Sequence, residues 1–263
     1  MPTLLLSRTC PPETSELAAV ARRARWNIQW LGRRHGPAHL HGDELALYAP
    51  TDVALRVSRL HQLALIEPML GILAGLPERY TSRQVNLMTL GEAELLDDRA
   101  FIKPADCTAK VFDAAVYECG SRILRDDDLS LDTPVLVSEP VEWENEYRTV
   151  VLERHVIAFS PYIRGGWLAR DAQGKCPCPA EESEGMLAFC RQLLADERID
   201  LPPAFVLDMG TITGRGWAVV ELNPVWCSGL LGCNLQAVLP ALRRACRRPS
   251  ELSPEDRRWL VAR

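Results

Sequence analysis

Residues 204–224, AFVLDMGTITGRGWAVVELNP, contain two apolar runs separated by a glycine-spaced segment. The runs Ala204–Met209 and Trp217–Leu222 have the length and composition of buried β-strands. The intervening residues 210–216 include three glycines, which favour a reversal of the chain. The stretch therefore predicts a β-hairpin whose two strands lie in the interior of the protein.

Three oxygen-bearing side chains are placed where these two strands end. Asp208 closes the first apolar run, and Glu221 and Asn223 close the second. If the strands pair, these side chains meet at one edge of a sheet. Mg²⁺ prefers one or two carboxylates, with its other ligands from phosphate and water, so the arrangement suits a magnesium site. The alternative is turn chemistry, in which Asp208 opens the turn and Asn223 begins the next loop.

A lysine occupies a similar position earlier in the chain. Phe101–Pro104 predicts a short strand ended by proline, and Lys103 in it can present a compact positive charge to a phosphate. Lys110 follows across the loop Ala105–Ala109, which could cover a ligand. The loop contains no glycine and lacks Walker A spacing, which excludes a P-loop. Alternatively, Lys103 is a strand-end lysine whose ammonium group reaches solvent.

An acidic segment follows the predicted strand Pro134–Ser138. It carries glutamates at positions 139, 142, 144 and 146, and Arg148 lies in the next strand. Extended backbone here could bind an adenine edge, with a carboxylate downstream for ribose hydroxyls. The alternative is a solvated acidic connection. Arg148 has apolar neighbours, so if it is buried it requires an anionic partner from protein or phosphate.

The remaining pattern predicts two units. In residues 1–98, a strand–helix–strand order and a later helix from Thr51 or Asp52 to Pro68 predict a small α/β layer with a parallel strand pair. Strands dominate residues 99–263. The elements expected in these two regions are strands Thr3–Ser7, Trp26–Trp30 and Val111–Tyr117, a hairpin of Tyr147–Leu152 with His155–Ser160, and helices Thr14–Arg25, one capped by Ser183, and Leu235–Ala245.

Composition limits the class of protein. With 263 residues, 47% hydrophobic and 25% charged, the chain can bury a sizeable core without disulfides or metals. A net charge of -5 gives no footprint for nucleic acid, and no apolar run reaches the length of a membrane helix. The nine cysteines and the absence of a secretory pattern predict reduced thiols in the cytoplasm. Cys176 and Cys178 lack a second pair for zinc and are interpreted as loop thiols.

Five phrases occur in an order that resembles the nucleotide site of ATP-grasp enzymes, over about residues 80–235. They are Phe101-Ile-Lys103-Pro, Val137-Ser-Glu139-Pro-Val-Glu142, Glu146-Tyr-Arg148, Val206-Leu-Asp208 and Val219-Val-Glu221-Leu-Asn223-Pro. The resemblance implies a mixed α+β or α/β protein with the ATP-grasp fold. Residues 1–98 would form an N-terminal α/β (pre-ATP-grasp) subdomain, and residues 99–263 the nucleotide-binding and catalytic domain.

The resemblance also implies roles for individual residues. Basic side chains would contact phosphate, the strand after them would bind adenine and ribose, and the hairpin would hold magnesium. The phosphate contacts would be Lys103 and Arg83, with Lys110 replacing a glycine-rich lid; the adenine hinge Val137, Ser138 and Glu139; the ribose ligand Glu142; the groups facing phosphate or acyl phosphate Arg148 and Arg164; and the magnesium ligands Asp208, Glu221 and Asn223.

The function implied by this resemblance is an ATP- and Mg²⁺-dependent carboxylate–amine ligase. ATP would phosphorylate a carboxylate of a small molecule or peptide, and an amine would attack the acyl phosphate. No Ser–His–Asp arrangement is recognisable, which agrees with a reaction that needs no protein nucleophile. A second copy of the chain is a candidate partner. Two alternatives remain: a kinase that phosphorylates a small molecule, and a nucleotide-binding module with degenerate activity.

Overall fold

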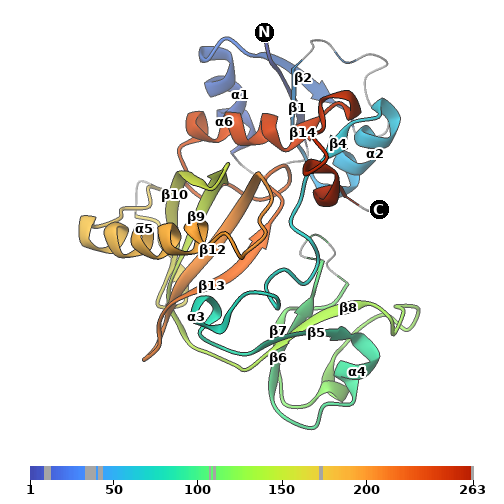
Figure 1. The fold of residues 1–263 in the computed structure, drawn as a ribbon, viewed down its shortest axis with the longest axis vertical. Coiled ribbons are helices and arrows are strands. Elements are labelled where there is room, and N and C mark those ends of the chain that lie inside the picture. Colours follow the sequence, from blue (N-terminus) through green and yellow to red (C-terminus); the bar gives the residue numbers. More distant parts are fainter. Residues whose placement is uncertain are drawn as a thin grey trace.

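The computed structural model describes residues 1–8, 13–32, 40, 44–106, 108, 111–171 and 174–261. Lys110, the expected lid cation, lies outside these residues. Within them the strands form sheets of three, four and five strands and one two-stranded pair (Figure 1). In the described part of the chain, no helix has the length and apolar character needed to cross a membrane.

The N-terminal layer is a parallel sheet in the order β2-β1-β3, covered by helices. Its strands are β1 (Thr3–Ser7), β2 (Asn27–Leu31) and β3 (Leu45–Tyr48), and its helices are α1 (Thr14–Arg23) and α2 (Thr51–His61). The parallel strand pair predicted from the sequence is therefore confirmed. The prediction that α2 extends to Pro68 is wrong, because Gln62 adopts a left-handed conformation with φ 52° and ends the helix.

The C-terminal part of the chain returns to this layer. Helix α6 (Leu235–Arg244) packs between the N-terminal sheet and the large central sheet, and all three contribute to one core. That core contains the fully buried Leu5, Val206 and Val238. Two short strands, β4 (Ala64–Leu65) and β14 (Cys246–Arg247), then join the end of the chain to residues that follow α2.

The small sheet is antiparallel in the order β5-β8-β6-β7. It consists of β5 (Val85–Thr89), β6 (Ala100–Pro104), β7 (Ala115–Tyr117) and β8 (Pro134–Ser138), with helices α3 (Glu78–Thr81) and α4 (Leu90–Glu94) beside it. Because β5 pairs with β8, this sheet crosses the division expected at residue 98. The strand expected over Val111–Tyr117 is shorter and occupies only its last three residues.

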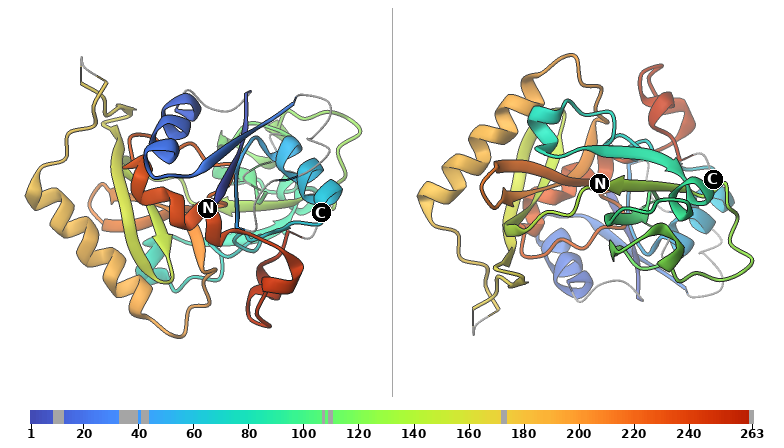
Figure 2. Two further views of the ribbon diagram at one scale, coloured as in Figure 1. Left: turned by 90° about the horizontal axis from the view of Figure 1, so that it is seen from above. Right: turned by 90° about the horizontal axis from the view of Figure 1, so that it is seen from below.

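The central sheet is antiparallel in the order β11-β10-β9-β12-β13. Its strands are β9 (Trp143–Leu152), β10 (His155–Arg164), β11 (Trp167–Leu168), β12 (Ala204–Ile212) and β13 (Gly216–Asn223). Helix α5 (Ala180–Ala195) covers one face, as Figure 2 shows, and α6 packs against the other. Both hairpins predicted from the sequence are confirmed. Glu153 and Arg154 make the first turn with positive φ values of 45° and 62°.

Two local expectations are wrong. Asp208 neither ends its strand nor opens a turn, because β12 continues through Met209 and Gly210 to Ile212 and the carboxylate lies in mid-strand. Ser183 does not cap α5, which begins at Ala180 after Pro179. The Ser183 hydroxyl instead donates to the Ala180 carbonyl within the first turn, at 2.8 Å.

Candidate active site

Three charged side chains lie in a row across the central sheet. Arg148 on β9 is paired in register with Asp208 on β12, and Asp208 is paired with Glu221 on β13. Directly opposed residues of antiparallel strands project from the same face of a sheet. The row lies on the face covered by α6 and the N-terminal layer, because the neighbouring Val150 and Val206 belong to that core. Strand register thus brings together residues from distant parts of the chain.

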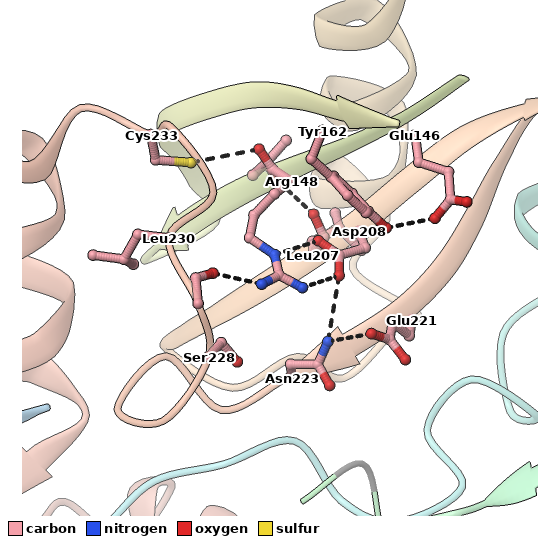
Figure 3. Close-up of polar contacts among 12 residues, drawn as sticks. Glu146, Arg148, Tyr162, Leu207, Asp208, Glu221, Asn223, Ser228, Leu230 and Cys233 are labelled. Atoms are coloured by element: carbon pink, nitrogen blue, oxygen red, sulfur yellow. Dashed lines mark hydrogen bonds and ion pairs between the residues drawn. The ribbon is translucent and has the colours of Figure 1, made fainter. Parts of the chain in front are cut away.

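The centre of the row is a buried ion pair. The Arg148 Nε donates to Asp208 Oδ1 at 2.9 Å, and a second guanidinium nitrogen donates to Oδ2 at 2.5 Å (Figure 3). Asp208 is completely buried and Arg148 is 8% exposed. Burial raises the pKa of Asp208 to about 6, against the opposing effect of Arg148. Burial would lower the pKa of Arg148, but the charge of Asp208 raises it, so the guanidinium stays protonated.

Glu221 is the more accessible carboxylate of the row. Lys103 Nζ lies 2.6 Å from its Oε2, and the Asn223 amide donates to its Oε1 at 2.8 Å. The same amide lies 3.4 Å from Asp208 Oδ2, so Asn223 bridges the two carboxylates. Burial alone would raise the pKa of Glu221, but the ammonium group of Lys103 and the other donors lower it to about 2. Glu221 is therefore ionised at neutral pH.

A cavity of about 380 Å³ lies between the small sheet and the central sheet. This nucleotide-sized cavity has apolar walls with a few polar groups, the usual composition of a small-molecule site. Its lining includes Phe101, Lys103, Ser138, Glu139, Trp143, Glu146, Tyr162 and Glu221. We refer to it as the first cavity.

A second cavity of about 670 Å³ lies between the central sheet and the N-terminal layer. Its lining is more polar and includes Thr51, Asp52, Thr108, Arg148, Glu221, Asn223, Ser228 and Gly229. Glu221 lines both cavities, so the two spaces are adjacent at this carboxylate. A group transferred past Glu221 would pass from a ligand in the first cavity to a ligand in the second.

Comparison with known proteins supports this interpretation. A family model described as an ATP-grasp domain, the second family of its clade, matches residues 80–241, more than half of the chain. The chain belongs to this ATP-grasp family. Family membership confirms the fold and the enzyme class predicted from the sequence, an ATP-dependent ligase. No curated protein sequence matches the chain.

Solved structures of ATP-grasp proteins share the fold at low sequence identity. The D-cycloserine synthetase DcsG is 15% identical with a TM-score of 0.55, and the match covers 93% of this chain and 97% of that one. The ATP-grasp ligase PsnB, complexed with a variant precursor, Mg and ADP, is 13% identical with a TM-score of 0.49 over 92% and 97%. D-alanine–D-alanine ligase from Bacillus anthracis is 11% identical with a TM-score of 0.44 over 89% of each chain.

The ATP-grasp site contains most of the residues singled out in the sequence. Five of them meet directly at the row across the central sheet: Lys103, Arg148, Asp208, Glu221 and Asn223. Of the expected adenine hinge, Ser138 and Glu139 line the first cavity, whereas the Val137 side chain is buried in the core of the small sheet. Glu139 also forms an ion pair with Arg215 at 2.5 Å.

The ribose ligand expected at Glu142 lies elsewhere. Glu142 is exposed and lines neither of the two cavities. Glu146, which the sequence reasoning did not select, lines the first cavity and accepts a 2.5 Å hydrogen bond from the Tyr162 hydroxyl. Burial raises the pKa of Glu146. The two-residue spacing from Arg148 could have identified it, because alternate residues of a strand share one face.

Arg83 reaches the first cavity but is heavily engaged with the backbone. Its guanidinium donates to the carbonyl oxygens of Thr81 at 3.0 Å and Val219 at 2.8 Å, and it stacks 4.9 Å from the centre of the Trp143 ring. Burial lowers its pKa to about 10. A phosphate contact by Arg83 stays a prediction, and most of its donors are already used.

Arg164 is separated from the row. Its guanidinium makes a bidentate pair with Glu182 of α5 at 2.5 and 2.7 Å and also donates to the Pro177 carbonyl. Arg164 therefore contacts the helix that covers the opposite face of the sheet. A role at an acyl phosphate would require this pair to open.

Proposed function

We propose that the protein is a carboxylate–amine ligase that activates a carboxylate as an acyl phosphate and transfers the acyl group to an amine. The observation that carries this proposal is the meeting of the two cavities at Glu221. ATP would occupy the first cavity with its terminal phosphate beside Lys103 and Glu221. The second cavity, at about 670 Å³, has room for an acid and an amine beside the same carboxylate.

The donor set fits a magnesium ion that accompanies the nucleotide. Glu221 is ionised and lies where both cavities meet, and Asn223 offers an amide oxygen beside it. Mg²⁺ is usually held by one or two carboxylates plus substrate phosphates. We assign Glu221 and Asn223 as the residues that would hold it. A direct bond from Asp208 would need exchange of its hydrogen bonds to Arg148. When bound, the ion neutralises phosphate oxygens during transfer.

Lys103 provides the mobile positive charge of the site. Its ammonium pairs with Glu221, and both side chains are partly exposed, at 14% and 28%. A nucleotide phosphate can therefore compete for the ammonium group as magnesium takes over the carboxylate. Positioning and charge neutralisation supply most of the catalysis of phosphoryl transfer, so these exchanges match the chemistry required.

The role of Lys103 can be tested by Lys103→Met, which keeps the aliphatic stem and removes the charge. We expect affinity for the Mg²⁺ complex of AMP-PNP, measured by calorimetry, to fall about tenfold or more. The free energy of unfolding should change by less than about 1 kcal/mol, because the lost pair is partly solvated. Lys175→Met, at an exposed position, is the control. Unchanged nucleotide affinity would assign Lys103 a structural role only.

The ribose contact can be tested by comparing two glutamates of the same segment. We propose that Glu146 accepts hydrogen bonds from the ribose hydroxyls, because it lines the first cavity and Glu142 does not. Glu146→Gln should weaken ATP binding about tenfold and reduce discrimination against an ATP analogue without ribose hydroxyls. Glu142→Gln should bind ATP like the wild type. The opposite result would restore Glu142 as the ribose ligand.

The reaction itself is tested by a screen of amino acids and short peptides for ATP-dependent phosphate release. For any acid that supports release, the carboxylate is labelled with ¹⁸O and the phosphate is analysed. An acyl phosphate intermediate transfers one labelled oxygen to the phosphate, because the bond between carbon and that oxygen breaks when the amine attacks. Phosphate that remains on the substrate would instead identify a kinase and overturn the proposal.

A further inference from the structure

One wall of the second cavity is the loop that connects β13 to α6. Ser228 and Gly229 of this loop line the cavity. The loop is folded on itself, since the Ser228 hydroxyl donates to the Pro224 carbonyl at 2.6 Å. It is also joined to the N-terminal layer, because the Ala49 amide donates to the Trp226 carbonyl at 3.0 Å. The position of this wall therefore depends on contacts from more than one part of the chain.

Arg148 holds the loop from the side of the central sheet. One terminal nitrogen of its guanidinium donates to the Gly229 carbonyl at 2.5 Å (Figure 3). The other two nitrogens bond Asp208, and the Tyr162 ring lies 5.6 Å away on one side. All three nitrogens of the guanidinium thus have protein partners. Arg148 therefore links the row of charges to the cavity wall.

Glu13 holds the same loop from the side of the N-terminal layer. The Leu230 amide donates to Glu13 Oε1 at 2.6 Å, and the Tyr48 hydroxyl lies 3.4 Å from the same oxygen. Glu13 occupies the N-cap position of α1, yet its side chain makes no capping hydrogen bond. A β-carbon placed on Gly229 would lie 3.6 Å from Glu13 Oε1 and 3.8 Å from an Arg148 nitrogen. The two charged groups therefore flank one residue of the loop.

We infer that Glu13 is a positioning residue: it fixes the Gly229–Leu230 backbone against Arg148 and so sets the wall that the second substrate meets. The effect passes from the N-terminal layer through Leu230 and Gly229 to the arginine beside Asp208. The identity of the second cavity as the acid and amine site rests on the proposed function. The contact between Glu13 and the loop does not.

The loop contact is tested first by amide hydrogen exchange in the full-length protein. Glu13→Ala should accelerate exchange at Leu230 about tenfold or more, because a hydrogen bond to a charged acceptor is lost. Amides of the central sheet should exchange as in the wild type. Glu16→Ala, an exposed position in the same helix, is the matched control and should change neither. Unchanged exchange at Leu230 in Glu13→Ala would overturn the inference.

The effect on the reaction is tested with an acid and amine identified in the screen. Glu13→Ala should raise the KM for the substrate in the second cavity about tenfold while calorimetric affinity for Mg²⁺–AMP-PNP stays unchanged. Glu13→Gln retains an acceptor oxygen and should restore much of the wild-type KM. Faster exchange at Leu230 with wild-type KM values would reduce Glu13 to a structural contact and overturn the positioning role.

Two further arms keep the outcomes distinct. If Glu13→Ala does not fold, Glu13→Asp keeps the charge but shortens the reach, and it should show the same changes in smaller measure. Wild-type exchange and KM in that variant would overturn the inference. If no acid in the screen supports turnover, the ligase proposal fails, and the exchange at Leu230 still decides whether Glu13 fixes the loop.

Discussion

Glu221→Gln is expected to reduce ATP turnover at least about a hundredfold while the protein stays folded. The substitution preserves size and keeps an oxygen that can accept from Lys103, so the packing at the end of β13 is retained. It removes the ionised carboxylate at the junction of the two cavities. Turnover is measured as phosphate release with the acid and amine identified in the screen, and folding by thermal denaturation.

Glu144→Gln is the matched control for this experiment. Glu144 is an exposed glutamate on the neighbouring strand β9, so the same chemical change there should leave turnover at the wild-type value. Magnesium dependence adds a second readout. The concentration of Mg²⁺ needed for half-maximal activity should rise in Glu221→Gln and stay unchanged in Glu144→Gln. A folded Glu221→Gln protein with near-normal turnover would remove Glu221 from the metal site.

Arg148→Met should lower the free energy of unfolding by about 3–5 kcal/mol. The reason is that Asp208, which is fully buried, would lose its bidentate partner and keep an uncompensated charge. Urea denaturation followed by circular dichroism measures the loss. Arg215→Met removes an exposed pair with Glu139 and should cost less than about 1 kcal/mol. Equal losses in the two variants would show that the buried pair is not a major determinant of stability.

The loss caused by Arg148→Met should depend on pH. Burial already raises the pKa of Asp208 to about 6 in the wild type, and removal of the arginine should raise it further. A carboxyl whose folded-state pKa exceeds its unfolded value stabilises the fold below the unfolded pKa, and this contribution disappears as pH rises through the folded pKa. The variant should therefore be closer to the wild type near pH 5 than near pH 8. Asp208→Asn in the same background should flatten this dependence.

The central hairpin and its converging side chains could be predicted because they depend on local pattern. Apolar runs of strand length around a glycine segment specify the pairing of β12 with β13, and pairing specifies that Asp208 faces Glu221. The extent of β12 could not be predicted. Gly210 looks like a turn residue in the sequence, but a β-carbon there would lie 2.3 Å from the Asn145 carbonyl oxygen and 2.8 Å from the Trp143 ring. This glycine allows close approach between strands.

The positions of Arg164 and Glu146 show where alternation helps and where it fails. Glu146 and Arg148 lie two residues apart on β9 and share the face that carries the row. Simple alternation from Tyr162 would place Arg164 on that face too. A register shift between Pro161 and Ile163 interrupts the pairing of β10 with β9, and Arg164 contacts Glu182 of α5 instead. A single-residue irregularity reverses which face a side chain occupies, and the sequence carries no clear mark of it.

The packing of α6 between two sheets has a consequence for how the protein is made. The first strand to leave the ribosome, β1, has its leucines in a core that also requires Val238 and Leu242. During synthesis, the N-terminal layer therefore waits with an open apolar face until residues 235–244 have emerged, by which time both antiparallel sheets are complete. Nascent chains stalled before α6 should be bound by chaperones through this layer, and release should coincide with the arrival of the helix.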